Sequence, residues 1–261
     1  MKNEYRPLKN KVTLVTGAGG GIGSEISKEF AQLGACVYLC DIADTGELAE
    51  RIFKAVGGIK PIPVQCDISN REEIVTMMDQ ISAERDGVDV LINNAAIKGP
   101  KGSHRFPEMD YEGFKLTANI DLSAAVHLTV KALPHMKKQQ WGRILFTAAP
   151  LSSSGIPAPY LTGKAGFLGL SKYLSTTYKG DGIKTFALAL RHTETPMIRK
   201  VIASKGVDVE EGLKKMHAKS LIGRMTTPAE IAKLFAYFAV QEDPEVTGVS
   251  LLSDGGITYL R

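Results

Sequence analysis

The sequence lacks the features of membrane-spanning and secreted proteins. Its 261 residues contain no apolar run close to the ~20 residues that a membrane-spanning helix needs. The first residues, 1–7, hold no apolar core of a signal peptide. We therefore expect a cytoplasmic protein that does not bind a membrane.

Cysteine is also scarce, with only Cys36, Cys40 and Cys66 in the chain. These residues form no CxxC pair, and two of them lie in a predicted strand. Small buried thiols are common in such strands. We expect three reduced core residues and no metal site.

The chain has no strong excess of charge of one sign. It carries 32 Lys and Arg against 28 Asp and Glu, a net charge of +4. The whole excess lies in residues 191–224, which hold eight basic and four acidic residues. This distribution argues against a nucleic-acid-binding protein with a basic face. It allows a local attraction for an anionic small-molecule substrate, although a solvated helix face explains the charges equally well.

Internal repeats, low-complexity tracts and linkers are absent, and short apolar runs alternate with helical patterns throughout the chain. The predicted strands are 11–16, 35–40, 61–66, 88–92, 143–148, 182–189 and 249–252. The predicted helices are about 22–33, 44–56, 70–85, 110–138, 159–179 and 228–240.

Continuous apolar strands separated by helices predict a parallel sheet with helices on both faces. We therefore expect an α/β protein: one doubly wound Rossmann-type domain over residues 1–261, with about seven strands. Ligands bind such sheets at the carboxyl ends of the strands. The long irregular stretch 190–224 is interpreted as a substrate-loop insertion.

A glycine-rich segment, 16–23 (TGAGGGIG), follows the first predicted strand and opens the first helix. Glycine lets the backbone turn sharply and approach a diphosphate, and a helix N-terminus offers free N–H groups. The spacing is not the usual G-x-G-x-x-G, because Ile22 stands where its last glycine would fall. Its position after the first strand favours a dinucleotide site over a plain tight turn. Gly17, Gly21, Ile22 and Gly23 are the predicted contacts.

Asp41 ends the second predicted strand, 18 residues beyond Gly23. An acid there accepts hydrogen bonds from the adenosine ribose hydroxyls. A 2′-phosphate would be repelled by this carboxylate by about 1–4 kcal/mol. No Arg or Lys in the glycine loop offsets the repulsion, so NAD is favoured over NADP. The alternative is that Asp41 only caps the next helix.

The sequence resembles the short-chain dehydrogenase/reductase family over nearly its whole length. The motifs that carry the resemblance are the T-G-x-x-x-G-I-G loop, Asp67-Ile68, 93–96 (NNAA), Tyr160-x-x-x-Lys164, 223–230 (GRMTTPAE) and 254–256 (DGG). The resemblance implies further cofactor contacts from Ile42, Asp67, Ile68, Asn94, Ala95, Tyr160, Lys164, Thr193 and Thr195. It also implies a homodimer or homotetramer formed through the helices at 110–138 and 159–179.

Tyr160 and Lys164 are four residues apart on a predicted helix, so both face the same way. A free tyrosine has a pKa of ~10 and is a poor base at neutral pH. A neighbouring ammonium stabilises the phenolate. The resemblance implies that Asn119 supports a water behind Lys164. It further implies an NAD(H)-dependent oxidoreductase that interconverts a secondary alcohol and a ketone, with Tyr160 as acid and base.

The family's catalytic serine has no clear counterpart. Counting along the strand from 142–144 (GRI) places Ala149 at its position, whereas counting back from Tyr160 reaches Thr147. We prefer the strand count, because a deletion is easier in a loop than in a buried strand. Loss of one oxyanion donor typically costs roughly 10²–10³ in rate. Ser152, the nearest of the serines at 152–154, is the candidate replacement, although a polar loop is an equal explanation.

A second departure follows the sixth strand, where Leu190-Arg191 stands in place of the family's Pro-Gly. Arg191 is a candidate clamp for a carboxylate or phosphate, and His192 a candidate proton donor. A surface loop is the competing interpretation for both.

The missing serine also raises two alternative functions: an NAD-binding protein with weak or no redox catalysis, and an epimerase that works through a transient ketone. The intact pair of Tyr160 and Lys164 favours the oxidoreductase.

Overall fold

A seven-stranded parallel sheet forms the centre of the computed structural model, which describes residues 5–97, 110–150, 156–191, 193–243 and 245–256. The strands are β1 (Val12–Thr16), β2 (Cys36–Asp41), β3 (Ile62–Gln65), β4 (Val90–Asn93), β5 (Gly142–Ala148), β6 (Ile183–Leu190) and β7 (Val249–Ser253). Their order is β3-β2-β1-β4-β5-β6-β7, and every neighbouring pair is parallel. The predicted doubly wound fold is confirmed.

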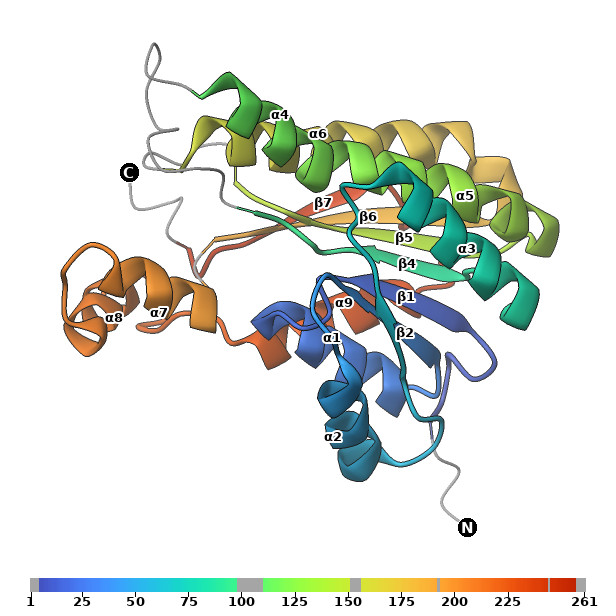
Figure 1. The fold of residues 1–261 in the computed structure, drawn as a ribbon, viewed down its shortest axis with the longest axis horizontal. Coiled ribbons are helices and arrows are strands. Elements are labelled where there is room, and N and C mark those ends of the chain that lie inside the picture. Colours follow the sequence, from blue (N-terminus) through green and yellow to red (C-terminus); the bar gives the residue numbers. More distant parts are fainter. Residues whose placement is uncertain (1–4, 98–109, 151–155, 192, 244, 257–261) are drawn as a thin grey trace.

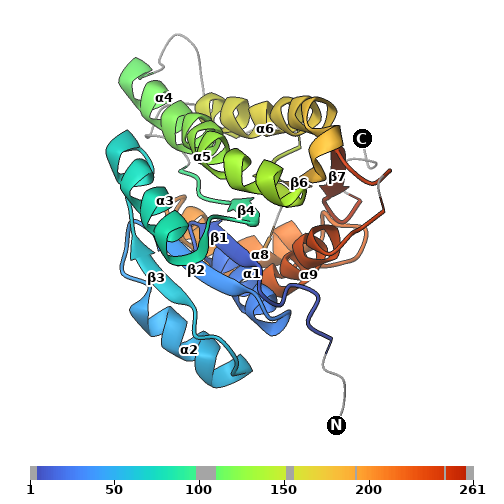
Figure 2. The same ribbon diagram turned by 90° about the vertical axis from the view of Figure 1, so that its right-hand side faces the viewer.

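Helices cover both faces of this sheet (Figures 1 and 2). One face carries α3 (Arg71–Arg85), α4 (Tyr111–Ala118), α5 (Ala124–Gln139) and α6 (Ala158–Thr177), and the other carries α1 (Gly21–Gln32), α2 (Gly46–Val56) and α9 (Pro228–Ala239). A 3-10 turn, η2 (Lys179–Asp181), precedes β6. No helix of the described residues is long and apolar enough to cross a membrane.

The burial of each strand depends on its place in the sheet. Every residue of β1, β4, β5 and β6 is buried, because helices pack on both of their faces. The edge strands β3 and β7 alternate between half-buried and exposed residues. Two large apolar clusters result, one on each face of the sheet. The central strands are therefore held on both faces, and this packing fixes where their carboxyl ends lie.

The predicted helix at 110–138 is interrupted. A turn of π-helix, η1 (Asn119–Ser123), separates α4 from α5. Asn119 and Asp121 lie in this turn, and the side chain of each forms a hydrogen bond with a backbone group of another segment. Such π turns are frequent at functional sites.

The expectation of an irregular stretch at 190–224 is wrong, because two helices lie within it, α7 (Pro196–Ala203) and α8 (Val209–His217). Thr195 caps the first helix and Asp208 caps the second. Ile202, Leu213 and Met225 form a small apolar cluster of their own. The two helices therefore form a separate lobe, which projects beyond one end of the sheet (Figure 1).

Candidate active site

The glycine loop connects the end of β1 to the start of α1. Gly17 has φ +64°, which a residue with a side chain rarely adopts. A Cβ at Gly23 would lie 2.1 Å from the Gly17 carbonyl oxygen, so the loop closes this tightly only with glycine. Helix α1 starts without a side-chain cap at Gly20, which leaves its first-turn N–H groups for an anion. The loop therefore fits a diphosphate, and Gly17, Gly21, Ile22 and Gly23 all lie in it.

Asn94 ties this loop to the ends of two central strands. Its side-chain nitrogen donates to the carbonyl oxygens of Thr16 at 3.0 Å and Gly17 at 3.2 Å. Its side-chain oxygen accepts from the Thr147 hydroxyl at 3.2 Å. The backbone N–H groups of Asn94 and Ala95 both donate to the Thr16 hydroxyl oxygen. Asn94 thus fixes the glycine loop relative to the ends of β4 and β5.

Asp41 lies at the end of β2 and faces the same loop. Its carboxylate accepts hydrogen bonds from Gly19 N–H at 2.9 Å and from Ala43 N–H at 3.1 Å. A fixed negative charge therefore lies beside the glycine loop. The next residue, Ile42, is 66% exposed, so its side chain is open to a ligand.

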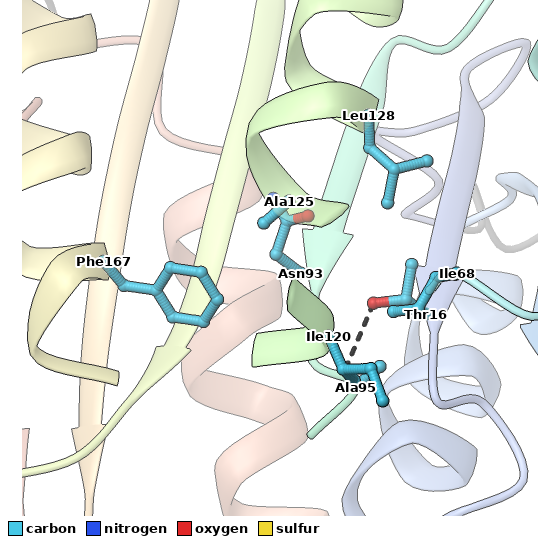
Figure 3. Close-up of a pocket in the computed structure, with 8 residues that line it drawn as sticks. All are labelled: Thr16, Ile68, Asn93, Ala95, Ile120, Ala125, Leu128 and Phe167. Carbon is cyan, nitrogen blue, oxygen red and sulfur yellow. Dashed lines mark hydrogen bonds between the residues drawn. The ribbon is translucent and has the colours of Figure 1, made fainter. Parts of the chain in front are cut away.

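A small crevice with no room for a water molecule lies between the end of β4 and the helices packed over it (Figure 3). Ile68, Ala95 and Ile120 line it, together with Thr16. Asp67 begins the turn that carries Ile68, and its carboxylate accepts from Ser69 N–H. The structure thus brings the predicted contacts Ile68 and Ala95 together, and it adds Ile120, which the motifs did not identify.

The π turn η1 lies next to this crevice. Asn119 donates from its side-chain nitrogen to the Ser69 carbonyl oxygen at 2.9 Å, so it links the turn of Ile68 to the helix layer. Asp121 is fully buried, and its Oδ1 accepts from Ile97 N–H at 2.9 Å. Sequence reasoning missed Asp121. The signal that could have found it is an acidic residue at an apolar position of the predicted helix 110–138.

Tyr160 and Lys164 lie one turn apart near the start of α6, as predicted. The Lys164 ammonium is buried, 5.9 Å from the centre of the Tyr160 ring, and has no hydrogen-bond partner among the described residues. Burial lowers the pKa of Lys164 to about 8, and the charge of Asp121 opposes that shift. Burial, and then the charge of Asp121, raises the pKa of Tyr160 to about 12. A buried, unpartnered ammonium beside a tyrosine suits a ligand that completes its bonding.

The end of β5 holds the two candidate counterparts of the missing serine, Thr147 and Ala149. Thr147 lies within the strand, and its hydroxyl already donates to Asn94. Ala149 follows the last residue of the strand and is buried. This geometry favours Ala149 as the counterpart of the serine position. The candidate replacement Ser152 lies outside the described residues.

Residues that follow β6 complete the site. Thr193 is buried and forms a bridge to Thr226, and Thr195 caps α7. A Cβ at Gly21 would lie 3.1–3.3 Å from Pro196 and Thr195, so α7 starts directly against the glycine loop. Arg191 is half-buried, and its Nε has no hydrogen-bond partner within the described ranges. His192 lies outside them.

Comparison with known proteins agrees with this geometry. A family model described as "Enoyl-(Acyl carrier protein) reductase" matches residues 17–258. The cis-4-hydroxycyclohexanecarboxylate dehydrogenase of Sinomonas cyclohexanicum is 30% identical over 250 residues, covering 95% of this chain and 96% of the relative. The D-beta-hydroxybutyrate dehydrogenase of Cupriavidus necator is 30% identical over 256 residues, covering 95% and 98%.

The fold is shared with a solved structure from Beutenbergia cavernae, assigned to an NAD(P)-dependent gluconate 5-dehydrogenase with NADP bound at low occupancy. It superposes with a TM-score of 0.86 at 28% identity and covers 97% of this chain and 98% of that one. These three proteins are named as dehydrogenases. The alternative of a cofactor-binding protein with weak or no catalysis therefore finds no support.

Proposed function

Because the chain belongs to the short-chain dehydrogenase/reductase family, whose members use nicotinamide cofactors, we propose that it is an NAD(H)-dependent oxidoreductase acting on a secondary alcohol or ketone. The observation that carries the proposal is the arrangement of Tyr160 and Lys164. A tyrosine needs a neighbouring positive charge to exchange a proton near neutral pH, and Lys164 holds a buried ammonium one helical turn away.

In this proposal the chain's own residues bind the cofactor and move one proton. The bound nicotinamide accepts or supplies the hydride. In the oxidation, the phenolate of Tyr160 takes the proton of the alcohol hydroxyl while the carbon gives up its hydride. In the reduction, Tyr160 returns that proton to the carbonyl oxygen. Lys164 holds the nicotinamide ribose and keeps the charge that stabilises the phenolate, and Asn119 supports a water behind it.

Asp41 supports NAD over NADP. Its carboxylate is fixed by Gly19 and Ala43, so it cannot turn away from a ligand without losing both hydrogen bonds. A 2′-phosphate beside it would meet a repulsion of about 1–4 kcal/mol. Ile42, Asp67, Ile68, Asn94, Ala95, Thr193 and Thr195 are proposed as further contacts of the cofactor.

We propose a hydroxy acid or keto acid as the substrate class. Three of the similar proteins are named for substrates that carry a carboxylate. In this chain Arg191 leaves the end of β6 with a buried Nε that has no partner in the described residues, and a guanidinium binds a carboxylate by paired hydrogen bonds. Three of the seven other basic residues of 191–224 are paired with acids, namely Arg199, Lys215 and Arg224.

The test follows nicotinamide absorbance while the purified protein turns over a panel of secondary alcohols with NAD. The panel includes hydroxy acids, the amides of the same acids, and polyols. We expect turnover on a hydroxy acid and a rate at least roughly 10²-fold lower for Tyr160→Phe, which lacks the acid and base. Tyr173→Phe, on the exposed side of the same helix, is the control. NAD binding without turnover on any substrate would contradict the proposed function.

The family is typically oligomeric, and we propose that this chain forms a homodimer or homotetramer. Its helices α4, α5 and α6 expose large apolar side chains. These are Tyr111, Leu116, Val126, Val130 and Tyr173. Burial of such side chains against a second copy would remove them from water.

A further inference from the structure

Asp121 is a buried acid that neither the motifs nor the proposed reaction uses. It lies in the π turn η1 with no exposed surface. One carboxylate oxygen accepts the hydrogen bond from Ile97 N–H, and the other, Oδ2, has no hydrogen-bond partner in the part of the chain that the structure describes. Burying a charge is costly unless another charge compensates it.

The group that compensates it is Lys164. Helix α6 approaches the π turn at Gly163, where a Cβ would lie only 2.8 Å from the Cβ of Asp121. Lys164 is the next residue, and its ammonium is also buried. It lies 4.9 Å from the centre of the Phe167 ring and has no hydrogen-bond partner within the described residues. The two groups do not form a direct ion pair, yet each is the charged group that acts on the other. Tyr160 is the third titratable group that shares this space.

The hydrogen bond to Ile97 does not explain the charge of Asp121. An asparagine has nearly the same shape and accepts from a backbone N–H equally well. A carboxylate at this position therefore adds only its negative charge, at the expense of desolvation. That charge favours the ammonium form of Lys164, and burial without it would favour the neutral amine.

We propose that Asp121 is a positioning residue for the reaction, whose buried carboxylate keeps Lys164 charged and oriented toward Tyr160 and the cofactor. This inference rests on the proposed function, because Lys164 and Tyr160 are the groups on which it acts. Asp121 has no exposed surface, and its effect is the electrostatic one of its charge on Lys164 and Tyr160.

The sign of the effect follows from the charges. A negative charge makes protons leave neighbouring groups less readily, so ionised Asp121 raises the pKa values of both Lys164 and Tyr160. Asp121→Asn removes that charge but keeps the hydrogen bond to Ile97. Both limbs of the pH profile depend on the pKa values of Tyr160 and Lys164, so both should move to lower pH.

The kinetic test compares the pH dependence of kcat/KM for the oxidation in the full-length wild type, Asp121→Asn and Asp79→Asn. We expect Asp121→Asn to shift both limbs down by roughly half to one pH unit. Asp79 forms an exposed ion pair with Lys131, and its variant is expected to keep the wild-type profile. A profile of Asp121→Asn that overlays the wild type would show a merely structural role and overturn the inference.

A second measurement needs no activity. Carbon-13 NMR of the chain labelled at aspartate carboxyls follows the titration of Asp121, whose pKa is raised to about 6, chiefly by burial. The signal is identified by its loss in Asp121→Asn. Lys164→Met removes the opposing positive charge, and we expect it to raise the midpoint by about one pH unit. Lys131→Met is the control that leaves the midpoint unchanged.

The two measurements separate this inference from the proposed function. If no substrate turns over but Lys164→Met still raises the Asp121 midpoint, the proposed function fails and the coupling of the two buried charges stands. If turnover is found but Lys164→Met leaves the midpoint in place, the proposed function stands and the inference is overturned.

Discussion

At the scale of single residues, Asp41 combines a structural role with a role in selectivity. Its carboxylate accepts from Gly19 N–H and therefore shapes the glycine loop, whichever nicotinamide cofactor binds. The same negative charge lies where the second ribose hydroxyl of the cofactor is expected. A substitution that keeps the size of the side chain and one acceptor oxygen but removes the charge separates the two roles.

We predict that Asp41→Asn binds NADP about tenfold more tightly than the wild type, because a repulsion of ~1–4 kcal/mol is removed. Binding of NAD should change less, since it meets no repulsion from Asp41 and the asparagine oxygen still accepts one of the two hydrogen bonds, from Gly19 or from Ala43. Titration calorimetry with both cofactors measures this. Asp44→Asn, which removes a charge three residues away, is the control. Wild-type protein that prefers NADP would show that our interpretation of Asp41 is wrong.

At the scale of elements, the lobe of α7 and α8 is held together by few buried residues. Its apolar cluster contains three buried residues, and exposed ion pairs of Arg199 also join its parts. Arg199 bonds to Glu194 before α7 at 2.8 Å and to Glu210 on α8 at 2.7 Å. Segments with few buried contacts open at low free-energy cost. The proposed role of 190–224 as a substrate loop agrees with this construction.

We predict that Arg199→Gln raises KM for the substrate by up to about fivefold, because exposed ion pairs contribute at most about 1 kcal/mol each. The thermal midpoint of the whole chain should hardly change, since the sheet and its two large clusters are untouched. Steady-state kinetics and calorimetry measure the two effects. Arg51→Gln on α2 is the control. A lowered midpoint with an unchanged KM would mean that Arg199 stabilises the fold and not the lobe.

At the scale of the whole molecule, helices α5 and α6 expose large apolar side chains on the same face of the sheet. Val126 and Val130 lie one turn apart on α5, and Val130 is 58% exposed. Helix α6 adds Tyr173, which is 63% exposed. A monomer gains nothing from such side chains in water, whereas an interface between copies buries them.

We predict that Val130→Glu shifts the protein from an oligomer toward a monomer, because a carboxylate at an apolar interface loses its hydration. Light scattering coupled to size-exclusion chromatography measures the mass. Val207→Glu, at an exposed apolar position near α8, should leave the mass unchanged. A wild-type protein that elutes as a monomer at all concentrations would contradict the proposed assembly.

The sequence by itself predicted the sheet, the glycine loop and the spacing of Tyr160 and Lys164. These features depend on local rules: apolar strands buried on both faces, glycines where the backbone turns, and the four-residue period of a helix. The same rules divided the chain into its elements within a few residues. They failed at 190–224, where two short capped helices bury too few apolar residues to give a clear period.

Only the tertiary structure brought together groups from distant parts of the chain. The bonds from Asn94 to Thr16, Gly17 and Thr147 join three strands, and no local pattern specifies them. The facing of Asp121 and Lys164 depends on a π turn and on the absence of a side chain at Gly163. Burial then sets the charges, because the pKa of a group depends on neighbours that folding supplies. The motifs predicted which residues react, and the packing of α6 on η1 decided the electrostatic environment of these residues.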